Sequence, residues 1–162
     1  MPRLLLALGT LAGAIQAATL QDVCTAEYVI ANLPSNGTLL GIEIDLSSVT
    51  AARLSASDDD ASSPVCDVNF AYTHNGLDRT NVNYWMPSPA NFMNRYVSTG
   101  GEGWNITEKN SSLPSGIELG AVAGTTDGGF GGFDVSSWEV WLNGDGEVNW
   151  DTVYMFGYKA ID

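Results

Sequence analysis

Apolar and polar residues alternate in several short segments of the chain, which is the pattern of β-strands that bury one face. Between Ile42 and Leu46 the apolar side chains alternate with Glu43 and Asp45, so that one face is apolar and the other acidic. Four further apolar segments are expected to form the main sheet, with antiparallel pairing among the early strands. These segments are residues 68–72, 82–86, 92–97 and 119–123.

Helical spacing of apolar residues is found only near the C-terminal end of the sequence. There Val153 and Phe156 recur at an interval close to one helical turn, and Asn149 or Asp151 can cap the first turn. We therefore predict one helix, over residues 151–161, in an otherwise β-rich chain.

Residues 1–17 have the layout of a secretory signal peptide. A basic start at Arg3 is followed by an apolar stretch over residues 4–15 and by the small residues Ala17 and Ala18. Because a stretch of about 12 residues is too short to cross a bilayer, we expect cleavage after Ala17 or Ala18 and secretion of the protein. A buried N-terminal helix is the alternative.

The charge of the chain is strongly acidic. Six basic residues stand against 19 acidic ones, which gives a net charge of −13. Such a surface repels nucleic-acid phosphates and anionic lipids, so neither a nucleic acid nor a membrane is expected as a partner. The charge indicates solubility rather than recognition of a partner.

Two cysteines, Cys24 and Cys66, follow the signal segment. In an oxidising compartment an even count predicts a disulfide between them. Closing a loop of about 43 residues lowers the entropy of the unfolded chain and would stabilise the folded state by roughly 4 kcal/mol. Pairing with cysteines beyond residue 162 is the alternative.

No metal site is predicted in the chain. Cysteine and histidine residues lack the spacing of a zinc site. Residues 55–64, inside the expected disulfide loop, contain three consecutive aspartates but no apolar anchor, and they are expected to form a mobile loop. Such an acidic run is usually solvated, so calcium is the less favoured interpretation.

Three Asn-x-Ser/Thr sequons begin at Asn36, Asn105 and Asn110. In a chain with a signal peptide they predict N-linked glycans on exposed loops. Asn36, between Ser35 and Gly37, has the most turn-like surroundings of the three.

A glycine-rich segment follows the strand that is expected to end at Val97. Gly100, Gly101 and Glu102 can turn backbone N–H groups outward, which is how a loop after a strand stabilises an oxyanion. These three residues are the candidate oxyanion loop. A tight turn that needs positive φ is the alternative.

No nucleophile accompanies this loop in the sequence. The chain has no Gly-x-Ser-x-Gly motif, and His74, the only histidine, lies in a polar, turn-like segment typical of a surface residue. Without a serine–histidine pair the chain is not expected to hydrolyse an ester, so no catalytic residue is assigned.

Four blocks between Val82 and Ile161 form a recognisable series: Asn83 to Pro87, Phe92 to Trp104, Gly124 to Gly132 and Tyr154 to Ile161. In order and spacing they resemble the N-terminal part of the tannase/feruloyl esterase family of secreted carboxylic ester hydrolases. The segment around Cys24 and the position of Cys66 are also similar to the family's disulfide-tied N-terminal region.

This resemblance implies an α/β fold of the α/β-hydrolase type with a large lid, and an aromatic ester, galloyl or feruloyl, as substrate. The family's Ser-Asp-His triad, the disulfide beside it and the calcium that many members bind in the lid are expected to follow residue 162. Asp162 stands where the family pattern usually has His. The chain is therefore expected to be an inactive N-terminal fragment that is truncated before the nucleophile elbow and has no cofactor of its own.

The predicted organisation has three parts: a signal peptide over residues 1–17, a disulfide-tied N-terminal β region over 18–81, and the first strands of an incomplete α/β-hydrolase domain over 82–162. The alternative is a small secreted, glycosylated, β-rich binding or structural protein without catalysis. Its tryptophans would suit stacking on carbohydrate, although tryptophans in a β-rich fold are more often core. They are Trp85, Trp104, Trp138, Trp141 and Trp150.

Overall fold

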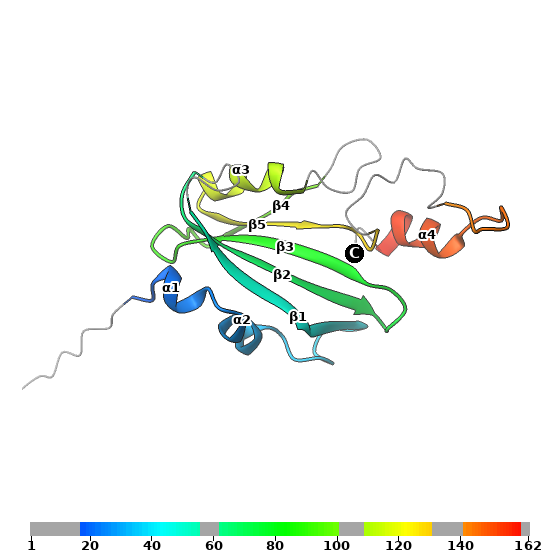
Figure 1. Cartoon of the computed structure of the whole chain (residues 1–162), viewed down its shortest axis with the longest axis horizontal. Coiled ribbons are helices and arrows are strands. Elements are labelled where there is room, and N and C mark those ends of the chain that lie inside the picture. Colours follow the sequence, from blue (N-terminus) through cyan, green and yellow to red (C-terminus); the bar gives the residue numbers. More distant parts are fainter. Residues whose placement is uncertain (1–16, 56–61, 101–108, 131–140, 160–162) are drawn as a thin grey trace, which may run out of the picture.

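A five-stranded sheet, in the order β1-β2-β3-β5-β4, organises the chain (Figure 1). The computed structural model describes residues 17–55, 62–100, 109–130 and 141–159. The strands are β1 (Ile42–Leu54), β2 (Val65–His74), β3 (Thr80–Pro87), β4 (Arg95–Ser98) and β5 (Ala121–Thr126). The helices are α1 (Leu20–Val23), α2 (Ala26–Asn32), the 3₁₀ turn η1 (Lys109–Ser112), α3 (Leu113–Glu118), α4 (Trp150–Tyr154) and the π-helical turn η3 (Met155–Lys159).

Strand pairing is antiparallel from β1 to β3 and from β3 to β5, which confirms the expected pairing of the early strands. β4 and β5 pair in parallel. Parallel neighbours cannot be joined by a tight hairpin, and here η1 and α3 lie in the connection between the two strands.

The predicted strands 68–72 and 82–86 fall within β2 and β3, which extend beyond them at both ends. The predicted strand 92–97 begins too early, because Asn94 has a φ of 54° and β4 starts only at the next residue. A left-handed residue interrupts the extended backbone that a strand requires.

The prediction of a strand over residues 119–123 is also displaced. Leu119 is the C-cap residue of α3, and Gly120 follows with a φ of 66°. A glycine in the left-handed conformation is a common way to end a helix. The strand therefore begins two residues later than predicted, at Ala121, and runs to Thr126.

The prediction that only the C-terminal end is helical was wrong, since α1, α2 and α3 precede it. These helices have four, seven and six residues, too few for apolar periodicity to be visible. A capping signal was nevertheless present for α2, because Thr25 Oγ1 accepts a hydrogen bond from Tyr28 N at 3.1 Å. The predicted C-terminal helix is confirmed in α4 and η3, with Asn149 as its cap.

The helices cover opposite faces of the sheet. Val65 and Cys66 are consecutive in β2 and therefore point to opposite faces. Val65 packs with Leu113 and Ile117 of α3, whereas Cys66 packs with Val29 of α2. Figure 1 shows α3 alongside β5 and α2 alongside β1.

A disulfide between Cys24 and Cys66 fastens the N-terminal helices to the sheet. The two Cα atoms are 5.5 Å apart, and both side chains are buried. The predicted pairing within the chain is confirmed, and residues 24–66 form the closed loop.

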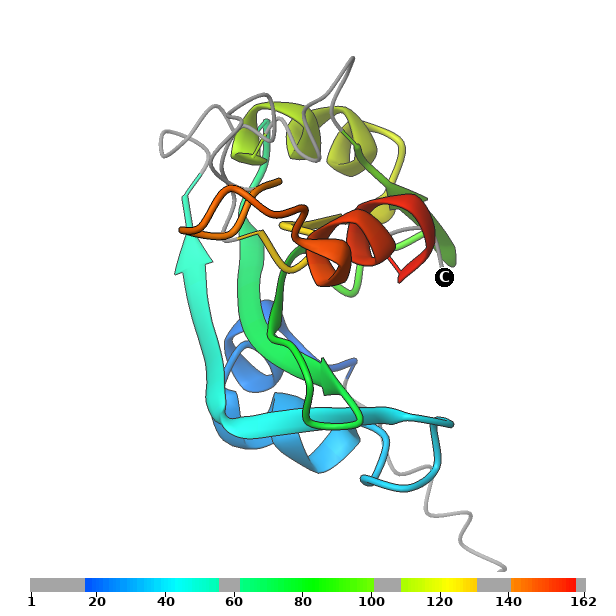
Figure 2. The same ribbon diagram turned by 90° about the vertical axis from the view of Figure 1, so that its right-hand side faces the viewer.

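β1 bends sharply partway along its length (Figure 2). Its register with β2 shifts between Asp45, which faces Ala71, and Thr50, which faces Asn69. Ser48 lies in this irregular stretch, and its Oγ accepts a hydrogen bond from Ala71 N at 2.8 Å. A bulge of this kind increases the bend of a strand.

One expected boundary falls inside a strand, and two expected segments lie outside the described residues. Position 81/82, expected to separate two regions, lies inside β3. The signal segment up to residue 16 and the acidic residues 56–61 are outside the described parts of the chain. Within the described ranges, no helix is both long enough and apolar enough to span a membrane.

Candidate functional site

The carboxyl ends of β4 and β5 lie at the same end of the sheet, as those of parallel neighbours do. Ser98 of β4 faces Gly124 of β5. Thr99 continues this contact, since its backbone N–H and its hydroxyl both donate to Gly124 O, at 2.7 and 3.1 Å. Open ends of parallel strands are common places for ligand-binding loops in α/β proteins.

The candidate oxyanion loop begins directly after Thr99. Gly100 is exposed, and a Cβ atom placed on it would meet no other atom within 4 Å. Gly101 and Glu102 lie outside the described residues. The structure therefore places the start of this loop at the end of the parallel pair, while the orientation of its N–H groups stays a prediction.

Gly124 also makes room for two tyrosines on the face of the sheet that carries α2. A Cβ atom on Gly124 would lie 2.6 Å from Tyr84 Cε1 and 2.7 Å from Tyr96 Oη. Burial, with a smaller contribution from the neighbouring Tyr96 and Tyr72, raises the pKa of Tyr84 to about 12. The phenol of Tyr84 therefore remains neutral at physiological pH.

Asp127, which the sequence analysis did not single out, closes the end of β5. Its side chain is only 7% exposed and accepts hydrogen bonds from Asn81 N at 2.9 Å, Asn81 Nδ2 at 2.6 Å and Gly129 N at 2.8 Å. In addition, Asp127 N donates to Asn81 O at 3.0 Å. Asp127 thus ties the first turn after β5 to the start of β3. Aspartate followed by two glycines after a strand is a turn signal that the sequence did contain.

His74 lies at the same end of the sheet, where β2 turns into β3. Its Nδ1 is 2.7 Å from Asp78 Oδ2, and its backbone N–H donates to Asp78 Oδ1 at 2.6 Å. The imidazole edge packs on Tyr72, with ring centroids 5.3 Å apart. Asp78 therefore closes the turn and orients the ring, which is a structural role.

A polar cavity of about 440 Å³ adjoins this end of the sheet. It is lined by Asp78 of the β2–β3 turn, by Gly129 and Phe130 after β5, and by Asp151 and Thr152 of α4. Its lining also includes apolar side chains, and none of the described residues that form it is a serine, cysteine or histidine. Within the described ranges, no three His, Cys, Asp or Glu residues gather as metal ligands.

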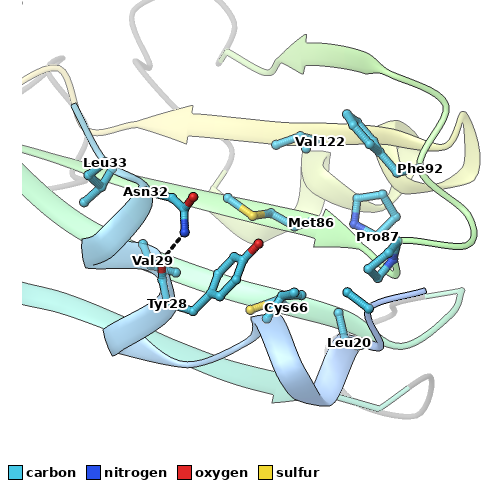
Figure 3. Close-up of a pocket in the computed structure, with 13 residues that line it drawn as sticks. Leu20, Tyr28, Val29, Asn32, Leu33, Cys66, Met86, Pro87, Phe92 and Val122 are labelled. Carbon is cyan, nitrogen blue, oxygen red and sulfur yellow. Dashed lines mark hydrogen bonds between the residues drawn. The ribbon is translucent and has the colours of Figure 1, made fainter. Parts of the chain in front are cut away.

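A second cavity, of about 400 Å³, lies between the N-terminal helices and the sheet (Figure 3). Its lining is almost entirely apolar and includes Val29, Met86 and Val122. The polar side chains at its rim are Tyr28 and Asn32, and Asn32 Nδ2 donates to Tyr28 O at 2.8 Å. This cavity can hold an apolar group, and none of the described residues that line it is a carboxylate, a histidine, a serine or a free cysteine.

The tryptophans do not form a common stacking surface in the described parts of the chain. Trp85 is completely buried and packs in the core beneath α3. Trp141 packs against Phe130 and Phe156, whereas Trp150 is 72% exposed. The other two, Trp104 and Trp138, lie outside the described residues.

Comparison with known sequences identifies relatives of this chain. The family described as tannase and feruloyl esterase matches residues 66–162. The protein named "Tannase" of Aspergillus oryzae is 42% identical over 161 residues, covering 96% of this chain and 27% of the relative. A "Probable feruloyl esterase" of Arthroderma benhamiae is 33% identical over 100 residues, covering 60% of this chain and 18% of the relative.

Two solved structures share the arrangement of the described residues. Tannin acyl hydrolase from Aspergillus niger superposes with a TM-score of 0.77 at 40% identity, covering 89% of this chain and 27% of that one. An esterase from Aspergillus oryzae superposes with a TM-score of 0.55 at 19% identity, covering 88% and 27%, and supports the fold alone. The chain thus spans 27% of the length of the tannase and of the tannin acyl hydrolase.

Proposed function

Since the chain belongs to the tannase and feruloyl esterase family, we propose that its sheet is the N-terminal part of the catalytic domain of a carboxylic ester hydrolase that acts on galloyl or feruloyl esters. The observation that carries this proposal is the family match over residues 66–162. That range contains β2 except its first residue, β3 to β5, the carboxyl ends of the parallel pair and the candidate oxyanion loop.

The chemical contribution proposed for this part of the enzyme is oxyanion stabilisation. In α/β-hydrolases one oxyanion donor comes from the loop after an early strand of the sheet, and the other follows the nucleophile. Gly100 to Glu102 follow β4 directly, so their backbone N–H groups are the proposed donors. Charge develops on the substrate carbonyl oxygen in the transition state, and fixed N–H groups stabilise it there.

The residues of this chain alone are proposed to be inactive. Its only histidine is held by Asp78, and the sequence has no nucleophile elbow. Acyl transfer by a serine hydrolase needs both a nucleophile and a base. We expect no hydrolysis of methyl gallate or methyl ferulate above background by residues 18–162, and ordinary turnover would contradict this.

A chimera tests the ester hydrolase function itself. Residues 18–162 replace the matching segment of the Aspergillus niger tannin acyl hydrolase, to which the chain superposes with a TM-score of 0.77. We expect the chimera to hydrolyse methyl gallate or methyl ferulate. A folded, monodisperse chimera without activity on either ester would argue against the proposal.

Two variants of the chimera test the oxyanion loop. Gly101→Pro removes one backbone N–H and is expected to lower kcat by about 10²–10³, the cost of one oxyanion donor. Gly100→Ala is the control, because it keeps its N–H and the added methyl meets open space. Equal kcat values for both variants would show that this loop supplies no oxyanion donor.

We further propose that the protein is secreted and carries N-linked glycans. The disulfide between Cys24 and Cys66 supports an oxidising compartment, and residues 1–17 have signal-peptide character. The net charge of −13 supports the absence of nucleic-acid and membrane partners.

A further inference from the structure

The side chain of Asn36 makes a two-point contact with the backbone of Ile44. Asn36 Oδ1 accepts a hydrogen bond from Ile44 N at 2.8 Å, and Asn36 Nδ2 donates to Ile44 O at 3.2 Å. One side-chain amide therefore satisfies both backbone groups of a single strand residue.

Ile44 belongs to β1, which is an edge strand of the sheet. In a strand, the N–H and C=O of one residue point to the same side, and those of Ile44 point away from β2 toward the open edge. A further strand would normally bond these groups. Ile44 is only 8% exposed, so leaving them without partners would be unfavourable. In the described part of the chain, the Asn36 amide is the partner that a further strand would otherwise provide.

The geometry of this contact depends on one particular hydrogen of Asn36. Ile44 N and O lie on the same side of the amide, so the Nδ2 hydrogen that donates must be the one on the same side as Oδ1. An N-linked sugar replaces one hydrogen of Nδ2 and makes the amide secondary. Secondary amides strongly prefer the trans form, in which the substituent lies on the same side as the oxygen. The sugar would thus occupy the position of the hydrogen that bonds Ile44 O.

The surrounding segment is fixed on both sides of this contact. Thr38 closes a turn, since its N–H and hydroxyl both donate to Ser35 O, at 3.1 and 2.6 Å. Gly41 O accepts a hydrogen bond from Asn75 N at 2.8 Å, which holds the start of β1 against the β2–β3 turn. The chain between these points has little freedom to move Asn36 away from the strand.

We infer that Asn36 is an edge clasp for β1 and carries no glycan in the folded protein, although it stands in a sequon. The clasp and a glycan compete for the same hydrogen of the same nitrogen. This inference departs from the prediction that all three sequons are glycosylated, and it leaves Asn105 and Asn110 as the proposed glycan sites.

Glycan occupancy tests the inference directly. The full chain is secreted from a eukaryotic host, the folded fraction is isolated, and each sequon peptide is analysed by mass spectrometry after enzymatic deglycosylation in heavy-oxygen water. We expect an unmodified Asn36. Thr38→Val destroys the sequon but keeps Asn36, and it is expected to change the glycoprotein mass only by the mass of the substitution itself. Thr38→Ser is the control that keeps the sequon. A glycan on Asn36 in the folded fraction would overturn the inference.

Thermal unfolding of enzymatically deglycosylated protein tests the clasp separately. Asn36→Ala leaves both Ile44 groups without a partner and is expected to lower Tm by about 5–10 °C. Ser35→Ala is the matched control, because it alters the neighbouring side chain and keeps the carbonyl that Thr38 uses. Equal Tm values for the two variants would show that Asn36 does not hold the edge.

Discussion

Gly116 of α3 lies so close to Ala123 of β5 that a Cβ atom on the glycine would stand 2.7 Å from the alanine Cβ. Helix and strand are therefore in direct contact at this point. The contact matters for the candidate oxyanion loop, because α3 belongs to the crossover connection between the parallel strands β4 and β5. The proximity of α3 to the sheet helps to place the ends of both strands.

Gly116→Ala is expected to destabilise the protein. The added methyl would press on a Cβ atom that cannot rotate away, and overpacking costs about 1–3 kcal/mol, more than the gain of up to about 1 kcal/mol from replacing a helical glycine. The free energy of unfolding in urea measures the net loss. Gly157→Ala in η3 is the control, since its methyl would meet no atom within 4 Å. Equal stability of the two variants would show that α3 can move.

Asp127→Ala is expected to cost about 1–3 kcal/mol of unfolding free energy, because it removes the buried carboxylate that accepts hydrogen bonds from Asn81 and Gly129. Chemical denaturation measures the change. The control is Asp145→Ala, an exposed aspartate that accepts a single hydrogen bond from Glu147 N, and its effect is expected to stay within about 0.5 kcal/mol. Similar losses for both would mean that the Asp127 contacts add little to stability.

Removing the disulfide is expected to lower stability by about 4 kcal/mol in the chain-entropy account of a loop of this length. A Cys24→Ser, Cys66→Ser double variant should show this loss in denaturant titration. Thiol labelling of the unmodified denatured protein should find no free thiol without reductant and two after reduction. Free thiols in the unreduced protein would contradict the pairing.

Tyr84 is expected to make stability fall at high pH. An unfolded tyrosine releases its proton near pH 10, whereas the folded side chain keeps it until about pH 12. Between these values the folded state binds more protons than the unfolded state, so stability decreases as pH rises. In a pH titration, the absorbance of tyrosinate should show a component that ionises near pH 12. Tyr84→Phe should remove this component, and the control Tyr154→Phe, at an exposed tyrosine, should keep it. Loss of that component in Tyr154→Phe would contradict the assignment.

His74→Ala is expected to leave ester hydrolysis by the chimera nearly unchanged, with kcat/KM within a factor of about two, which corresponds to about 0.4 kcal/mol. The imidazole closes a turn through Asp78 and so supports the fold. Steady-state kinetics with methyl gallate checks this. A fall of several orders of magnitude would assign His74 a catalytic part.

Local patterns predicted β2 and β3 well, and these consecutive strands pair with each other. β2 and β3 were located because their alternation is long and their pairing is antiparallel. The boundaries of β4 and β5 were less accurate, because they depend on single left-handed residues, Asn94 and Gly120. The short helices were missed because four to seven residues cannot display an apolar period.

By itself, the sequence determined the alternating strands, the pair of cysteines, the acidic charge and the family resemblance, because each is encoded in nearby residues or in composition. Only the tertiary structure decided that Asp127 closes the start of β3 and that Asn36 occupies the edge of β1. These contacts join residues 46 and eight positions apart, and they form only once the strands are placed in the sheet. A sequon or a turn motif specifies what a side chain can bind, and the fold determines which partner reaches it.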